Sequence, residues 1–153
     1  MDSDDLHDLR TDYAKGALNE ADLASDPIAQ FQRWFADAQA ANVPEPNAMT
    51  LATADERGVP SARIVLLKEL DARGFTLFTN YDSRKGDDLA KNPRASLLFF
   101  WQPLERQVRI DGTVERVDRA ISQQYFDSRP LKSRIAASLS HQSEVVPARK
   151  VLE

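Results

Sequence analysis

Arg63 and Lys68 stand at the two ends of an apolar run, residues 64–67, that is typical of a buried strand. Buried charge is costly unless opposite charge compensates it, so the segment predicts an anionic partner. Residues five apart on a regular strand face opposite sides. Either the two cations serve two anionic groups, or one of them is simply solvated at the strand end. For a single strand, the simpler interpretation is that Arg63 and Lys68 are exposed to solvent at the strand ends.

A second basic pair lies in the segment SRKGDDLAKNP, residues 83–93. Ser83 is a candidate helix cap, which places Arg84 and Lys85 in the first helical turn. Cations are unfavourable there because the helix N-terminus carries partial positive charge. The same end binds phosphate readily through its free N–H groups. The pair therefore indicates a bound anion, unless Asp87 and Asp88 neutralise it. Two basic clusters in an acidic chain favour a phosphorylated ligand.

A third group consists of Tyr125, Arg129 and Ser133. Tyr125 and Arg129 are four apart and share a helix face, whereas Pro130 interrupts the helix before Ser133. A ring, a guanidinium and a hydroxyl can together hold a ring that carries a phosphate. Residues at this spacing also occur simply as exposed surface residues that bind no ligand, so the pattern alone leaves both interpretations open.

Familiar catalytic groupings are scarce in this chain. The two histidines, His7 and His141, lie in polar segments, and Cys is absent, which excludes thiolate catalysis. The five glycines are scattered rather than grouped in a phosphate-binding loop, and no metal-ligand spacing stands out. If the protein is an enzyme, a cofactor is expected to carry the difficult chemistry.

Length and charge limit the class of protein. The chain has 153 residues and a net charge of −4, with a pI of about 5.2. This length suits one domain, and this charge argues against nucleic acid as a partner. The acidic first ten residues lack the basic and apolar regions of a signal peptide, and the longest apolar run, residues 97–101, is too short to cross a membrane. A cytoplasmic protein without a membrane partner is expected.

Hydrophobic periodicity predicts a mainly β fold with flanking α-helices, of the α+β class. We expect a flexible N-terminal arm at 1–26 and one domain at 27–153. A helix should begin at Pro27 after a cap at Ser25 or Asp26. The other expected elements are three strands in an antiparallel meander (48–54, 60–70, 75–80), a short helix (83–93), two strands (94–101, 104–117) and two helices (118–129, 130–140). Asp111-Gly112 is either a hairpin turn or a bulge in a long strand.

Several strings then occur in a characteristic order: RIVLLK, FTN followed by SRK, NPRASLLFFW, LERQVRIDGTVERV, YFDSRP and HQS. Together they resemble the flavin-dependent pyridoxamine 5'-phosphate (pyridoxine 5'-phosphate) oxidases, from about Leu9 to the chain end. The resemblance implies an FMN-binding split β-barrel with antiparallel Greek-key topology. It also implies a homodimer with FMN at the interface, and it favours Gly112 as a bulge. The family's C-terminal dimerisation and substrate region, beyond the equivalent of Glu153, is expected to be absent.

The resemblance also assigns site residues. The positions that match FMN contacts are Arg63, Ile64, Val65, Leu66, Leu67, Lys68, Phe78, Thr79, Arg84, Lys85, Gln107, Gln142 and Ser143. Those that match substrate contacts are Arg10, Thr11, Asp12, Tyr13, Lys68, Tyr125, Arg129 and Ser133. No residue matches a catalytic acid, base or nucleophile. Two different anionic ligands would explain why Arg63 and Lys68 can face opposite ways.

The implied reaction is oxidation of pyridoxamine 5'-phosphate or pyridoxine 5'-phosphate to pyridoxal 5'-phosphate, a step in vitamin B6 metabolism. Dioxygen is the expected electron acceptor and hydrogen peroxide the by-product. Two alternatives remain open at this point. One is a related split-barrel flavin oxidase, such as those of phenazine biosynthesis. The other is a protein that binds flavin or pyridoxal phosphate without turnover.

Overall fold

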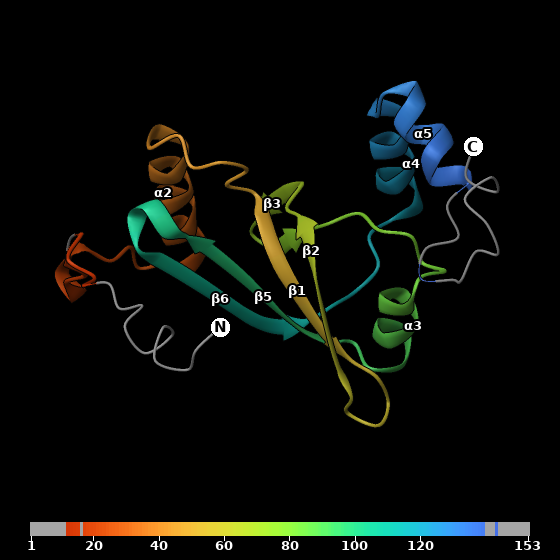
Figure 1. Cartoon of the computed structure of the whole chain (residues 1–153), viewed down its shortest axis with the longest axis horizontal. Helices are drawn as coiled ribbons and strands as arrows, with labels where there is room; N and C mark the ends of the chain where they lie inside the picture. The colour runs from red at the N-terminus through yellow and green to blue at the C-terminus, as the bar shows by residue number, and fades with distance from the viewer. Residues whose placement is uncertain (1–11, 16, 140–142, 144–153) are drawn as a thin grey trace, which may run out of the picture. The chain divides into compact units, whose positions relative to one another are not determined.

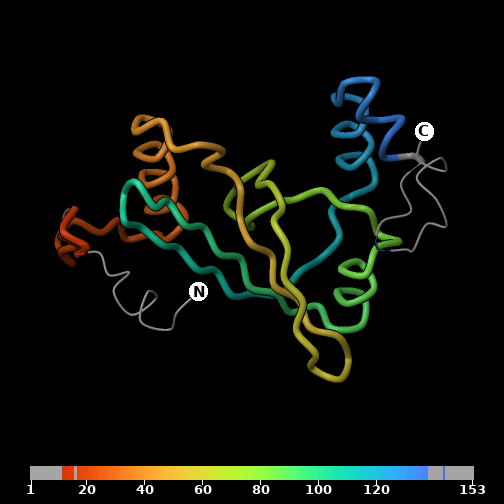
Figure 2. The backbone as a smooth tube through the Cα atoms, in the orientation of Figure 1, coloured from red at the N-terminus to blue at the C-terminus, as the bar shows by residue number. Residues whose placement is uncertain are grey.

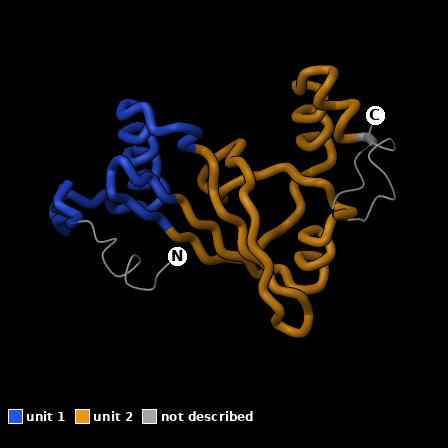
Figure 3. Tube along the Cα trace, viewed as in Figure 1, with its two compact units in different colours: residues 1–46, 100–108 blue, residues 47–99, 109–153 orange. Residues whose placement is uncertain are grey.

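The computed structural model describes residues 12–15, 17–139 and 143 (Figure 1). The chain divides into two compact units (Figure 3). One comprises Met1–Pro46 with Phe100–Val108, and the other comprises Asn47–Phe99 with Arg109–Glu153. None of the described helices is both long enough and apolar enough to span a membrane.

The first unit is built around α2 (Pro27–Ala40), preceded by the 3-10 turn η1 (Glu20–Asp22). As expected, Asp26 caps α2, and its carboxylate accepts hydrogen bonds from the backbone N–H groups of Ile28 and Ala29. The apolar face of α2 buries Phe31, whose ring lies 5.8 Å from that of Trp101. The 3-10 turn η2 (Gln102–Leu104) follows Trp101. An aromatic core therefore organises this unit.

The main sheet has the strand order β2-β1-β5-β6. Its strands are β1 (Ala48–Ala54), β2 (Pro60–Leu66), β5 (Arg94–Trp101) and β6 (Arg106–Thr113), as Figure 1 shows. β1 pairs antiparallel with both β2 and β5, so that Thr53 lies opposite Ser61 on one side and Ala95 on the other. Alternate residues of β1 are buried, beginning with Met49 and Leu51. This alternation is the period-2 pattern that predicted the strand.

The prediction of a three-strand meander is wrong in its third strand. β2 ends at Leu66, and the next residues form β3 (Glu69–Asp71), which pairs with β4 (Gly74–Thr76) in a separate two-stranded sheet. Between β2 and β3 the backbone changes partners. The N–H of Leu67 donates to the carbonyl of Asn47, whereas the N–H of Lys68 donates to the carbonyl of Thr76. Periodicity could not reveal this change, because both sheets need extended backbone.

The helices agree with the predictions. They are α3 (Arg84–Lys91), α4 (Arg119–Ser128) and α5 (Leu131–Leu139), with Pro130 separating the last two. α3 packs against β1. The tube in Figure 2 can be followed from β6 through a linker into α4. β6 continues through Gly112 to Thr113, so the hairpin-turn alternative for Asp111-Gly112 is wrong.

Candidate functional site

Three cations converge in the second unit, and we call Arg63, Arg84 and Lys85 the cation cluster. Arg63 is half-buried on the inward face of β2, and Arg84 and Lys85 form the first turn of α3. Burial lowers the pKa of Arg63, and the charge of Arg84 lowers it further, although Asp88 opposes this. Burial also lowers the pKa of Lys85, with a further contribution from the charge of Arg63. The three charges therefore act on one another across the gap between strand and helix.

The guanidinium of Arg63 is held by neutral oxygens. Its Nη1 donates to the carbonyl of Leu51 at 3.2 Å and to Oγ1 of Thr53 at 2.8 Å. Its Nη2 donates to Oγ of Ser61 at 2.7 Å. Three of the five N–H donors of arginine are thus used, and none of the three accepting groups carries a charge. The side chain is fixed in place while its positive charge stays largely available.

The acidic residues of α3 play a different part from the one considered in the sequence. Asp88 is 5% exposed and accepts a hydrogen bond from Oγ1 of Thr53 at 2.7 Å. Its Oδ2 lies 3.9 Å from Nη2 of Arg63. Asp88 therefore faces Arg63 rather than the helix-start pair, and Asp87 is exposed. Neither acid forms an ion pair with Arg84 in the described part of the chain.

A tight turn leads into α3. Ser83 is fully buried at the cap position, but its side chain does not cap the helix as the sequence suggested. Its hydroxyl donates instead to the carbonyl of Asn80 at 2.7 Å and accepts from Nζ of Lys85 at 3.0 Å. Gly86 is buried directly against the backbone of Tyr81. The first N–H groups of α3 are consequently left without a side-chain cap.

This arrangement is suited to holding an anion. The N-terminus of α3 supplies uncapped N–H groups and a partial positive charge. Arg84 is exposed and makes no hydrogen bond or ion pair with any described residue. Such a site matches the dianion of a phosphate monoester, which accepts several charge-assisted hydrogen bonds. The anion site at this helix start stays a prediction, and the uncapped N–H groups and the exposed Arg84 are consistent with it.

A second group gathers around Tyr125, and we call Phe78 and Tyr125 the ring pair. The two rings stack with their centroids 3.9 Å apart and their planes 6° from parallel. Nζ of Lys68 lies 5.9 Å from the centre of the Tyr125 ring. The structure thus brings together Lys68, from the junction between sheets, Phe78, from the segment after β4, and Tyr125 of α4. In the sequence these residues belong to three separate strings, RIVLLK, FTN and YFDSRP.

Arg129 and Ser133 are less closely tied to this group. Arg129 follows the last residue of α4, and Ser133 lies in the first turn of α5. Both are half-buried, and their side chains make no hydrogen bond with the described residues. Tyr125, Arg129 and Ser133 therefore share one helical hairpin, without a direct hydrogen bond between them.

The remaining predicted residues occupy varied positions. Ile64 points away from Arg63 and is 67% exposed, Val65 and Leu66 are half-buried and Leu67 is buried. Thr79, directly after Phe78, is half-buried, and Gln107 is exposed on β6 in the first unit. Asp12, Tyr13 and Ser143 are exposed. Arg10, Thr11 and Gln142 lie outside the described residues.

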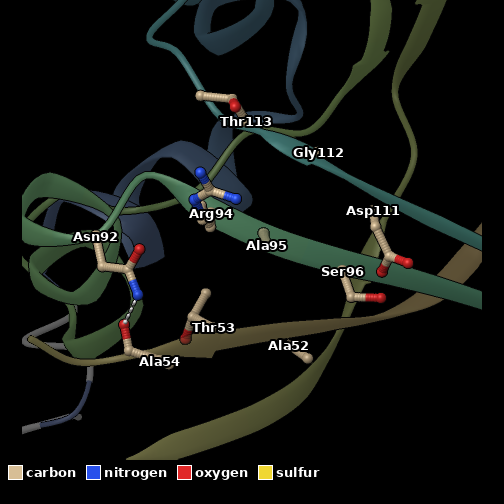
Figure 4. A pocket seen from close by; sticks show the side chains of 10 residues that line it. All are labelled: Ala52, Thr53, Ala54, Asn92, Arg94, Ala95, Ser96, Asp111, Gly112 and Thr113. Atoms are coloured by element: carbon tan, nitrogen blue, oxygen red, sulfur yellow. Dashed lines mark hydrogen bonds between the residues drawn. The ribbon is translucent and has the colours of Figure 1, made fainter. Parts of the chain in front are cut away.

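Sequence reasoning missed Thr53, which is 4% exposed and links Arg63 to Asp88. The available signal was its place on the buried face of β1, where a hydroxyl needs a partner. It also did not identify an open hollow that Thr53 helps to line. That hollow, of about 500 Å³, contains none of the predicted site residues. Its walls are Ala52, Thr53, Ala54, Asn92, Arg94, Ala95, Ser96, Asp111, Gly112 and Thr113 (Figure 4).

Comparison with known proteins gives a consistent result. Residues 35–153 match the sequence family described as pyridoxamine 5'-phosphate oxidase. The pyridoxine/pyridoxamine 5'-phosphate oxidase of Bordetella avium is 64% identical over 148 residues, which are 97% of this chain and 70% of that protein. The protein of the same name from Cupriavidus necator is 62% identical over the same shares.

Two solved structures resemble the fold. PhzG from Burkholderia lata, in complex with tetrahydrophenazine-1-carboxylic acid, has a TM-score of 0.85 and 33% identity, over 89% of this chain and 68% of that one. An FMN-binding protein related to pyridoxamine 5'-phosphate oxidase, from Nostoc punctiforme, has a TM-score of 0.65 and 13% identity, over 85% and 72%. The second likeness concerns the fold alone. The predicted fold class, a split barrel of the α+β class with an antiparallel sheet and flanking helices, is confirmed.

Proposed function

The chain belongs to the pyridoxamine 5'-phosphate oxidase family of oxidoreductases, and we propose that it oxidises pyridoxamine 5'-phosphate or pyridoxine 5'-phosphate to pyridoxal 5'-phosphate. With the amine, dioxygen and water are consumed, and ammonia and hydrogen peroxide are released. With the alcohol, dioxygen alone is consumed and hydrogen peroxide is released. The identity of 58–64% to oxidases of this name supports the substrate class.

The cation cluster is the observation that carries the proposal. FMN is the cofactor, and its phosphate fits at the start of α3, where Arg84 is exposed and the helix N–H groups are uncapped. Arg63 and Lys85 would add two further cations from the strand and the helix. Bound FMN would supply the acceptor for a hydride from the substrate carbon and the route of the electrons to dioxygen. The task of these residues is to bind and orient, which agrees with the scarcity of acid–base groups.

The group around Tyr125 is proposed to hold the substrate. Lys68, Arg129 and Ser133 can bind a phosphate through an ammonium, a guanidinium and a hydroxyl. Phe78 would connect this group to the flavin, because it matches a flavin contact and its ring stacks on that of Tyr125. The two phosphate sites would thus be separate, one for the cofactor and one for the substrate. A fixed distance between them would hold the substrate carbon against the flavin.

We further propose a homodimer with FMN at its interface, located in the cytoplasm. Several large apolar side chains of the second unit are exposed, among them Ile64 at 67%, Leu131 at 63% and Ile135 at 50%. Apolar side chains that are exposed in one chain can be covered in a dimer, and we propose that a second copy covers these. Ile64 lies next to Arg63 in sequence, so a second copy that covers Ile64 would approach the cofactor-binding strand.

A related flavin oxidase remains the second candidate, because PhzG shares 33% identity and a TM-score of 0.85. The higher identity to pyridoxine/pyridoxamine 5'-phosphate oxidases favours the first. A protein that binds flavin without turnover would keep the cation cluster and fail only in catalysis.

Mixing the FMN-loaded protein with pyridoxine 5'-phosphate without oxygen separates these cases. Bleaching of the flavin band supports the oxidase, and a band that persists with both B6 substrates contradicts it.

The cofactor site is tested separately by replacing Arg84 and Lys85 together with alanine. We expect FMN affinity to fall at least about tenfold, because charge-assisted contacts to phosphate are lost. Lys91→Ala is a matched control, since Lys91 ends the same helix and its ion-pair partner among the described residues is the exposed Glu56. Fluorescence titration with FMN measures both. Equal affinity of the double variant and the control would show that the phosphate does not bind at α3.

A further inference from the structure

The connection from Asp88 to Arg63 is unusual for a site that binds anions. An acidic side chain that is 5% exposed stands beside Arg63 of the cation cluster, where its charge opposes the binding of an anion. A buried charge of this kind persists only with partners that compensate it. Its partners are the hydroxyl of Thr53, at 2.7 Å, and the guanidinium of Arg63, at 3.9 Å.

The direction of the hydrogen bonds shows what the acid does. A carboxylate only accepts, so the single proton of the Thr53 hydroxyl must point to Asp88. The lone pairs of the same oxygen are then turned towards Arg63, whose Nη1 donates to it at 2.8 Å. Without Asp88 the hydroxyl could rotate its proton elsewhere and offer Arg63 a poorer acceptor.

We propose that Asp88 is a positioning residue for the phosphate of the cofactor, acting through the Thr53 hydroxyl on Arg63. We call the chain of hydrogen bonds from Asp88 through Thr53 to Arg63 the relay. Together with the bonds to Leu51 and Ser61, it fixes both Nη atoms of the guanidinium. Two N–H donors of Arg63 remain for the phosphate, in a fixed direction. Three cations and one carboxylate also leave the site with a net positive charge that can neutralise a phosphate dianion. This inference rests on the proposed function, because it assumes that the cation cluster holds the phosphate.

The test compares FMN with riboflavin, which lacks the phosphate, by fluorescence titration of the full chain. Thr53→Val removes the hydroxyl and keeps the shape and every charge of the site. It should weaken FMN binding about tenfold, as expected for a lost hydrogen bond to a charged group, and leave riboflavin binding within about twofold. Thr53→Ser retains the hydroxyl and should restore FMN affinity to within about twofold of the wild type.

Asp88→Asn distinguishes the relay from a simple ion pair. The amide oxygen can still accept from Thr53, and one negative charge near the phosphate is lost, so FMN should bind no more weakly than to the wild type. Circular dichroism and thermal melting establish that each variant is folded before titration. Because Thr53→Val leaves a buried acid with one partner fewer, Asp88→Asn keeps the proposal testable if the valine variant fails to fold.

The titrations distinguish a failure of the positioning role from a failure of the proposed phosphate site. If Thr53→Val weakens FMN and riboflavin equally, or neither, the positioning role is wrong although the site stands. The positioning role is also wrong if Asp88→Asn loses about tenfold in FMN affinity, because charge alone would then hold Arg63. If the wild type binds FMN and riboflavin equally well, and Arg84→Ala changes neither, the phosphate site itself is wrong and the positioning role with it.

Discussion

Gly86→Ala should destabilise the protein, although alanine is the better helix former. A Cβ at Gly86 would collide with the carbonyl oxygen of Tyr81 and lie only 2.7 Å from its carbonyl carbon. Ordinary carbon contacts need about 3.5–4.0 Å, so the start of α3 would have to move by about 1 Å. The obstacle is backbone, which cannot rotate away as a side chain can. The variant should also weaken FMN binding, because Arg84 and Lys85 of the cation cluster lie on the same turn.

The expected loss of folding stability is the difference between two opposing contributions to the free energy. Overpacking of a buried position costs about 1–3 kcal/mol, and replacing glycine by alanine in a helix returns up to about 1 kcal/mol. A net loss of about 1–2 kcal/mol lowers the melting temperature of a chain of this size by about 2–8 °C. Thermal melting followed by circular dichroism measures this loss. Gly112→Ala is the control, because no atom lies within 4 Å of a Cβ placed there. A melting temperature for Gly86→Ala at or above that of the control would refute the reasoning.

Three further predictions concern other parts of the chain. Asp26→Ala removes both side-chain acceptors at the start of α2 and should cost about 1 kcal/mol in urea unfolding, whereas Asp26→Asn should cost far less. Phe78→Leu and Tyr125→Leu should be coupled by about 1 kcal/mol in a double-mutant cycle, and additive losses would mean that the stack contributes nothing. Burial lowers the pKa of Lys85, so FMN binding should weaken, and folding stability rise, as the pH rises through that lowered value. If binding stays constant up to the usual pKa of lysine, Lys85 does not contact the phosphate.

The sequence alone predicted most of the elements, because local physics determines them. The cap at Asp26 with Pro27 predicted the start of α2, and the alternation in residues 48–54 predicted β1. The helix-start pair Arg84 and Lys85 also led to the prediction of an anion site from sequence alone, because cations at that end need a compensating partner. These signals act over a few residues and are readable without the fold.

Only the tertiary structure decided which partners those residues have. It divided the expected strand 60–70 between two sheets, because Leu67 and Lys68 donate to different neighbouring segments. It also turned Asp88 towards Arg63 and Thr53, residues more than twenty positions away, rather than towards the cations beside it in the chain. A buried acid takes whichever partner the packing of helix on strand brings within hydrogen-bond distance. That choice depends on contacts between distant segments, which periodicity and spacing do not encode.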